Sequence, residues 1–86
     1  MKTCFVYVLG AREKSGKPRT YVGWTNDLER RIAQHNAGIG ARSTRGRIWK
    51  LLYVESFMTR QEAMKREWHL KRDEKMRREL RKCLVL

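Results

Sequence analysis

The chain has 86 residues, and its 21 Lys and Arg against 9 Asp and Glu give a net charge of +12. This length allows one domain covering residues 1–86, and 41% hydrophobic residues exclude a disordered chain. No apolar run approaches the ~18 residues of a membrane span, and the first residues lack a signal-peptide cleavage pattern. We therefore expect a cytoplasmic protein without a membrane partner. The positive charge indicates a polyanionic partner, first of all nucleic acid.

The chain contains two cysteines, Cys4 and Cys83, far apart in the sequence. Because there is no secretion signal, we expect both to be free thiols. The two histidines, His35 and His69, lack the spacing of zinc ligands. The sequence therefore predicts no structural zinc site.

Two strands joined by a turn are predicted first. Residues 5–9 are apolar on both alternating faces and rich in β-branched and aromatic side chains, as in a buried strand. Residues 10–19 contain Ser15-Gly16-Lys17-Pro18 and predict a turn. Residues 20–24 predict the second strand of a hairpin. Gly23, near its end, indicates a bend or the close approach of other atoms.

A helix is predicted from Asn26 to Asn36. Asn26 and Glu29 have the spacing of a capping box, and Asn36-Ala37-Gly38 provides the stop. The helical period separates two adjacent arginines. Arg31 falls at the edge of an apolar face and Arg30 on the opposite side, the face itself being formed by Leu28, Ile32 and His35.

Residues 38–50 form a predicted loop that contains no acidic residue. In a chain of this charge, a loop with only basic charges is better explained as a surface that contacts phosphates than as an ordinary solvated loop. Its basic residues are Arg42, Arg45, Arg47 and Lys50. Residues 49–54 are apolar enough to predict a third strand.

The second predicted helix opens with Thr59-Arg60-Gln61-Glu62, a capping box. Its expected apolar arc consists of Ala63, Met64, Trp68 and Leu70. Glu67 falls inside that arc, where a carboxylate is costly unless it is paired or binds a cation. Two interpretations stay open: an ion pair with Lys71 four residues on or with a nearby arginine, or a metal ligand or catalytic carboxylate. A charged, solvated helix from Lys71 to Lys82 follows, and Leu84-Val85-Leu86 ends the chain.

Together these residues resemble the GIY-YIG nuclease superfamily. Val6-Tyr7-Val8 stands at the place of the first motif, and Tyr21-Val22-Gly23 matches the second. Arg31 follows Tyr21 by ten residues and His35 follows by four more, as in the family pattern. Glu67 matches the acidic metal ligand of the family.

The resemblance covers residues 3–72 and is strongest to the small stand-alone proteins of the YhbQ type. His35-Asn36 and Arg66-Glu67-Trp68 also resemble the nuclease domain of the Slx-type structure-specific endonuclease. The first motif departs from the family, because Phe5-Val6-Tyr7 replaces Gly-Ile-Tyr and no glycine closely precedes the tyrosine.

The resemblance implies a metal-dependent endonuclease that hydrolyses phosphodiester bonds in DNA, linked to repair or recombination. It implies Mg²⁺, or alternatively Mn²⁺, on Glu67, and Arg31 as a donor to phosphate oxygens. Tyr7 would activate water with Tyr21 positioning it, and we expect Arg31 and the metal to depress the pKa of Tyr7. His35 is the alternative base, because its ordinary pKa of about 6.5 needs less adjustment.

The expected partner is DNA, branched or single-stranded, while a protein partner and the oligomeric state stay open. The expected phosphate contacts are Arg42, Arg45, Arg47, Lys50 and Lys71.

The predicted fold is α/β (α+β): a small three-stranded, mostly antiparallel sheet flanked by helices, in the order β-β-α-β-α-α. A non-catalytic module that binds nucleic acid is the second hypothesis, motivated by the missing glycine. A basic protein that binds structured RNA is the third.

Overall fold

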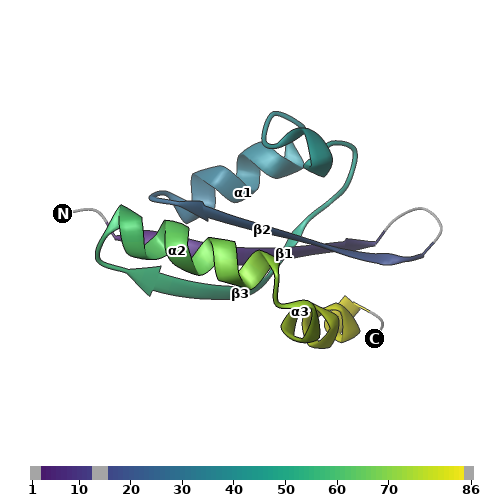
Figure 1. Cartoon of the computed structure of the whole chain (residues 1–86). Helices are drawn as coiled ribbons and strands as arrows, with labels where there is room; N and C mark the ends of the chain where they lie inside the picture. Colours follow the sequence, from purple (N-terminus) through teal and green to yellow (C-terminus); the bar gives the residue numbers. More distant parts are fainter. Residues whose placement is uncertain (1–2, 13–15, 85–86) are drawn as a thin grey trace.

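A computed structural model describes residues 3–12 and 16–84, and it confirms the predicted fold class and element order. One sheet contains β1 (Cys4–Arg12), β2 (Pro18–Thr25) and β3 (Lys50–Phe57). Its strand order is β2-β1-β3 and both pairings are antiparallel. The helices are α1 (Leu28–Asn36), α2 (Arg60–Lys71) and α3 (Glu74–Arg81), with the 3-10 turns η1 (Arg42–Thr44) and η2 (Lys82–Leu84) (Figure 1).

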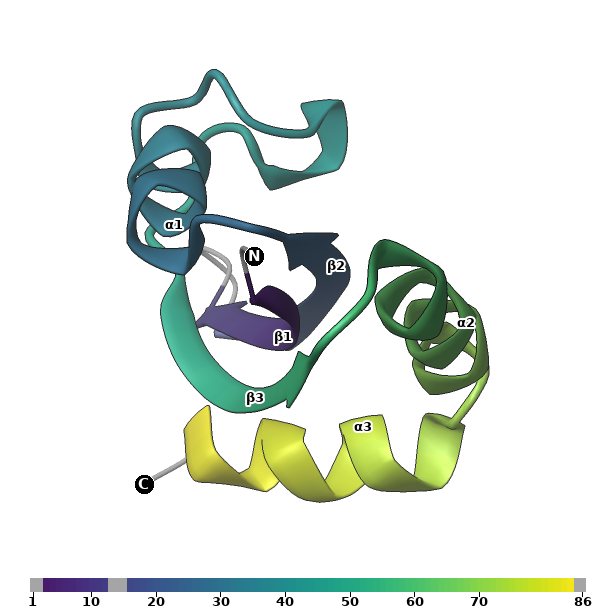
Figure 2. The ribbon, with the colours of Figure 1, turned by 90° about the vertical axis from the view of Figure 1, so that its left-hand side faces the viewer.

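Helices cover both faces of the sheet, α1 on one side and α2 and α3 on the other (Figure 2). The continuous apolar run in β1 explains why this strand is central, since it is buried on both faces. Val6 and Val8 pack toward Ala63 and Leu70 of α2. On the alternate face Tyr7, Leu9, Ala11 and Trp49 form a second cluster, joined by Tyr21, Leu28 and Ile32.

The hairpin of β1 and β2 is confirmed, with longer strands than the pattern predicts. Residues 10–12 belong to β1 and residues 18–19 to β2, so half of the predicted turn is strand. Backbone pairing extends these strands beyond the apolar residues. The Ser15 position of the predicted turn lies outside the described residues, as do Val85 and Leu86. The third strand starts at Lys50 and extends to Phe57, and Trp49 is a buried residue just before it.

Two helix starts differ from the predictions. The N-cap of α1 is Asp27, not Asn26, because the Asp27 side chain accepts a hydrogen bond from the Arg30 backbone N–H. The charged segment after Lys71 is not one continuous helix from that residue. Arg72 ends α2, and the Asp73 side chain caps a new helix that begins at Glu74. The predicted Thr59 cap of α2 is confirmed.

The buried face of α2 is rotated relative to the predicted arc. Ala63 and Leu70 are buried as expected, whereas Met64 is 44% and Trp68 is 54% exposed. Arg66, on the inner side, forms a two-bond ion pair with Glu55 of β3 at 2.9 Å for both contacts. This pair and the close packing at Ala63 orient the helix, so Met64 and Trp68 lie outward.

Within the described residues, no helix has the length and apolar character needed to cross a membrane. Cys4 is buried and Cys83 is exposed, and both are free, as the sequence predicts.

Candidate active site

Three rings from three different elements meet on the α1 face of the sheet. The ring centroids of Tyr21 and His35 are 4.9 Å apart, those of Tyr7 and His35 6.0 Å, and those of Tyr7 and Tyr21 6.4 Å. The Tyr7 hydroxyl and His35 Nε2 are 2.9 Å apart. His35 is fully buried, in keeping with its predicted place on the apolar face of the helix, and Tyr7 is buried with it, while Tyr21 keeps partial exposure.

Thr44 determines which nitrogen of His35 carries the proton. Thr44 Oγ1 donates a 2.7 Å hydrogen bond to the Ala41 carbonyl, which can only accept. The 2.9 Å contact between His35 Nδ1 and Thr44 Oγ1 therefore has Nδ1–H as its donor. In the neutral ring Nε2 is then unprotonated and accepts the Tyr7 O–H. The result is a directed chain from Tyr7 through His35 and Thr44 to Ala41.

Burial controls the protonation of these hydrogen-bonded side chains. It raises the pKa of Tyr7 to about 12, and Arg31 acts in the opposite direction without overcoming it. In the protein alone the lowering effect of Arg31 is outweighed by burial, and the joint effect expected of Arg31 and a metal stays a prediction. Burial, followed by repulsion from Arg31, lowers the pKa of His35. At neutral pH the pair consists of a phenol and a neutral imidazole.

Two glycines make room for these rings. A Cβ on Gly23 would lie 2.5 Å from the Tyr7 Oη and 3.1 Å from Tyr21 Cε2. A Cβ on Gly40 would lie 2.5 Å from His35 Nδ1. The predicted close approach at Gly23 is thus confirmed, whereas the sequence analysis did not single out Gly40. The missing glycine of the first motif does not interrupt β1, in which Val6 and Tyr7 pair regularly with Trp24 and Gly23.

The basic loop is attached to α1 by contacts that no sequence pattern predicted. Asn36 Oδ1 accepts a 2.6 Å bond from the Trp49 N–H, and Asn36 Nδ2 donates to the Trp49 carbonyl at 3.2 Å. Trp49 Nε1 donates to the Thr44 carbonyl at 2.8 Å. The only available signals were the polar types of Asn36 and Thr44, which are common in loops. The loop that carries Arg42 and Arg45 is therefore held against His35.

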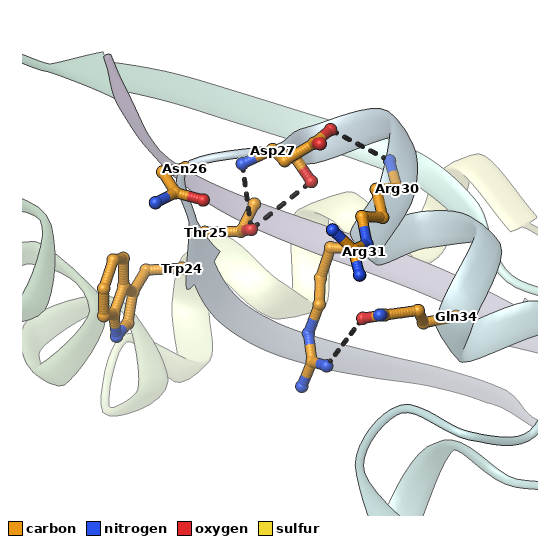
Figure 3. A pocket seen from close by; sticks show the side chains of 7 residues that line it. All are labelled: Trp24, Thr25, Asn26, Asp27, Arg30, Arg31 and Gln34. Carbon is orange, nitrogen blue, oxygen red and sulfur yellow. Dashed lines mark hydrogen bonds between the residues drawn. The ribbon is translucent and has the colours of Figure 1, made fainter. Parts of the chain in front are cut away.

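Arg31 lies at the rim of this cluster and lines a pocket with a volume of about 370 Å³ (Figure 3). Its Nη1 donates to Gln34 Oε1 at 3.1 Å. Arg30 is exposed and Arg31 is half-buried, as the helical period predicts, and both line this pocket. Both belong to the first turns of α1 beside the end of β2, where the helix and the strand together form the walls.

Glu67 faces the sheet from α2 with 21% of its side chain exposed. Burial is the main cause of the raised pKa of Tyr7, and the charge of Glu67 is the smallest of its contributions. Lys71 Nζ lies 3.6 Å from Glu67 Oε1, so the ion pair considered from the sequence is present. The neighbouring Arg66–Glu55 pair fixes the helix on β3 and thereby the direction of Glu67.

The residues fit a weakly held divalent cation. Among the described residues, no group of three or more His, Cys, Asp or Glu side chains forms a metal cage. One half-buried carboxylate suits Mg²⁺, which keeps much of its water shell and is bound by one or two carboxylates together with substrate phosphates. Glu67 is the side chain that would hold it.

The predicted phosphate contacts occupy two regions. Arg42 and Arg45 are exposed on the loop beside α1, Arg47 is half-buried and donates to the Ser43 carbonyl at 3.2 Å, and Lys50 is exposed at the start of β3. Lys71 lies apart from them on α2. The structure thus brings Tyr7, Tyr21, Arg31 and His35 together, with the basic loop on the α1 side. Glu67 lies on α2, and its assignment to the same site stays a prediction.

Comparison with known proteins assigns the chain to a family. Residues 3–80 match the model of the GIY-YIG catalytic domain. The UPF0213 protein CPE1444 of Clostridium perfringens is 46% identical over 69 residues, which is 79% of this chain and 70% of the relative. A UPF0213 protein of Lacticaseibacillus paracasei is 39% identical over 80 residues, 92% of this chain and 85% of the relative.

The solution NMR structure of the UPF0213 protein BH0048 from Bacillus halodurans is 35% identical, with a TM-score of 0.48. The match covers 90% of this chain and 79% of that one. The family model spans nearly the whole chain and includes both tyrosines, the arginine, the histidine and the glutamate discussed above. The chain therefore belongs to the GIY-YIG catalytic domain family, and the activity that this domain implies is that of a nuclease.

Proposed function

We propose that this protein is a metal-dependent endonuclease that hydrolyses DNA and acts in repair or recombination. The observation that carries the proposal is the convergence of two phenols, an imidazole and a guanidinium around Tyr7, supported by a half-buried carboxylate, Glu67, on α2. Phosphodiester hydrolysis needs these functions: an acceptor for the proton of water, donors to the phosphate oxygens, and a ligand for a cation.

In this proposal the exposed groups contact the substrate and the buried pair moves the proton. Arg31 donates to the non-bridging oxygens of the scissile phosphate, and Tyr21 positions the attacking water. As the Tyr7 oxygen takes a proton from that water, the proton of Tyr7 passes to His35 Nε2. This relay combines the two bases that the sequence left as alternatives. It also makes deprotonation of Tyr7 before the reaction unnecessary.

Glu67 would hold Mg²⁺, which when bound supplies positive charge that polarises the phosphate. The Lys71 ammonium balances the Glu67 charge in the protein alone. Arg42, Arg45 and Arg47 hold backbone phosphates next to the scissile one. Their attachment to His35 through Thr44 places these contacts at a fixed distance from the site.

A cleavage assay on branched, single-stranded and duplex DNA, with Mg²⁺ and with a chelator, tests the proposal. We expect Glu67→Gln and Arg31→Ala each to slow cleavage about a hundredfold or more, the usual effect of losing one group that stabilises the transition state. Matched controls are Glu79→Gln and Arg78→Ala on exposed positions of α3, which should cleave at the wild-type rate. Cleavage by Glu67→Gln at the wild-type rate would contradict the site, and binding without metal-dependent cleavage would favour the non-catalytic module.

A further inference from the structure

A pocket beside the ring cluster combines an aromatic surface with several cationic groups. Its lining consists of Trp24, Thr25, Asn26, Asp27, Arg30, Arg31 and Gln34 (Figure 3). The one carboxylate among them, Asp27, caps α1 by accepting the Arg30 backbone N–H. In the figure the indole lies on one side, and Arg31 and Gln34 lie on the other. A volume of about 370 Å³ falls within the range of small-ligand sites, about 300–1,000 Å³.

The cations of this pocket are largely without acidic partners. Arg30 donates its backbone N–H to Asp27, and its guanidinium makes no ion pair with a described residue. Arg60 of α2 stacks over the Trp24 ring with its guanidinium carbon 5.5 Å from the centroid, and within the described chain it too has no acidic partner. A ligand that suits this arrangement must therefore offer both negative charge and a flat aromatic system.

Trp24 is the residue that the catalytic cluster leaves unused. It follows the second motif directly, and strand alternation points it away from Tyr21 and Gly23, toward the side of α2. Its ring is half-buried against the core, so it is held rigidly where it lines the pocket. A rigid aromatic side chain next to guanidinium groups is the common way of stacking an unpaired base while binding its backbone.

We infer that this pocket binds one unpaired nucleotide of a DNA strand, next to the phosphate held by Arg31. The base stacks on the face of Trp24 that Arg60 covers in the protein alone, so Arg60 leaves the ring and pairs with a flanking phosphate, as does Arg30. The Asn26 and Gln34 amides face the edge of the base. Arg31 belongs to both the pocket and the proposed reaction site, so the nucleotide is a direct neighbour of the scissile bond. This inference rests on the proposed function for the identity of the polymer, and it specifies a substrate with a single-stranded segment, such as a flap.

Fluorescence anisotropy in chelator tests the inference without any cleavage. The probes are a labelled flap DNA and a blunt duplex of the same length and sequence at one stated salt concentration. We expect Trp24→Ala to bind the flap about tenfold or more weakly, within the range reported for losing one stacked base, and to bind the blunt duplex unchanged. Trp24→Phe should retain most of the flap affinity. Trp68→Ala, which removes an exposed indole from the outer side of α2, should bind both probes like the wild type.

A base-removal series identifies the nucleotide. An abasic position introduced in turn at each unpaired nucleotide nearest the junction should weaken wild-type binding at one position only. The same abasic DNA should bind Trp24→Ala without further loss, because the stacking partner is already gone. Arg30→Gln should reduce the steepness of the salt dependence by about one phosphate contact, and Arg78→Gln should not.

The inference is overturned if Trp24→Ala binds the flap like the wild type, or loses flap and duplex affinity equally. It is also overturned if Trp68→Ala loses as much flap affinity as Trp24→Ala. The same holds if the abasic substitution weakens binding by Trp24→Ala as much as it weakens binding by the wild type. If thermal unfolding shows that Trp24→Ala does not fold, Trp24→Leu keeps apolar volume while removing the aromatic face, and the same outcomes apply. Flap-specific binding without cleavage in Mg²⁺ would contradict the proposed function alone, and metal-dependent cleavage with unchanged Trp24→Ala binding would contradict this inference alone.

Discussion

Replacing Thr44 by Val isolates the hydrogen bond that orients the proton of His35. Valine keeps the shape of the side chain and removes the hydroxyl that accepts from His35 Nδ1 at 2.9 Å and donates to the Ala41 carbonyl at 2.7 Å. The Ala41 carbonyl keeps the hydrogen bond from the Thr44 backbone N–H at 3.0 Å. The loss of stability therefore comes mainly from the buried imidazole, whose Nδ1–H loses its acceptor.

The expected loss of stability follows from this accounting of hydrogen bonds. A net hydrogen bond contributes about 1 kcal/mol, and a buried donor left without a partner costs about 1–3 kcal/mol. We expect Thr44→Val to lower the free energy of unfolding by about 2–3 kcal/mol, measured by urea denaturation. Thr44→Ser, which keeps the hydroxyl and loses one methyl group, should lose only about 1 kcal/mol.

The decisive measurement is nitrogen-15 NMR of the His35 ring. In the wild type we expect Nδ1 to be protonated and Nε2 to be the acceptor, and in Thr44→Val we expect a mixture of the two neutral tautomers. Cleavage should slow with the same variant and recover in Thr44→Ser, because the Tyr7 proton needs an open Nε2. Identical ring nitrogen shifts in wild type and Thr44→Val would refute the assignment of the tautomer to Thr44.

Three further predictions concern other parts of the site. Gly23→Ala should destabilise the fold by about 1–3 kcal/mol in urea denaturation, because its Cβ would lie 2.5 Å from the Tyr7 Oη, and it should slow cleavage by displacing that hydroxyl. Acidification below about pH 6.5 should destabilise the wild type more than His35→Gln: burial lowers the pKa of folded His35, so the unfolded chain binds that proton first and stability falls as pH falls. The double variant Arg42→Gln/Arg45→Gln should weaken DNA binding and reduce the slope of log K against log salt by about 2, measured by anisotropy.

Each of these predictions has its own contradicting result. A Gly23→Ala protein with wild-type stability would show that the Tyr7 ring moves freely. Equal loss of stability on acidification in wild type and His35→Gln would assign the pH effect to other groups, such as Glu55, whose pKa is lowered by Arg66. An unchanged salt slope in Arg42→Gln/Arg45→Gln would show that the loop arginines do not contact DNA. The double variant Lys75→Gln/Arg78→Gln on α3 is the charge-matched control.

Patterns between near neighbours in the sequence determined the element order and most of the candidate residues. The apolar run of residues 5–9 specified a central strand, since only a strand buried on both faces tolerates it. The Thr59–Glu62 spacing specified the start of α2. The intervals of ten residues from Tyr21 to Arg31 and of four more to His35 could be recognised because a short spacing can be read directly from the sequence.

The tertiary structure decided what depends on contacts distant in sequence. The orientation of α2 comes from the Arg66–Glu55 pair, and so Trp68 lies outward although its spacing predicted burial. The pKa of Tyr7 is set by burial among three elements, which no local pattern reports. The tautomer of His35 depends on a loop threonine nine residues away, and the shared pocket of the two adjacent arginines depends on where β2 ends against α1. Sequence thus determined which groups are available, and packing determined their charge, direction and neighbours, because burial and long-range contact exist only in the folded chain.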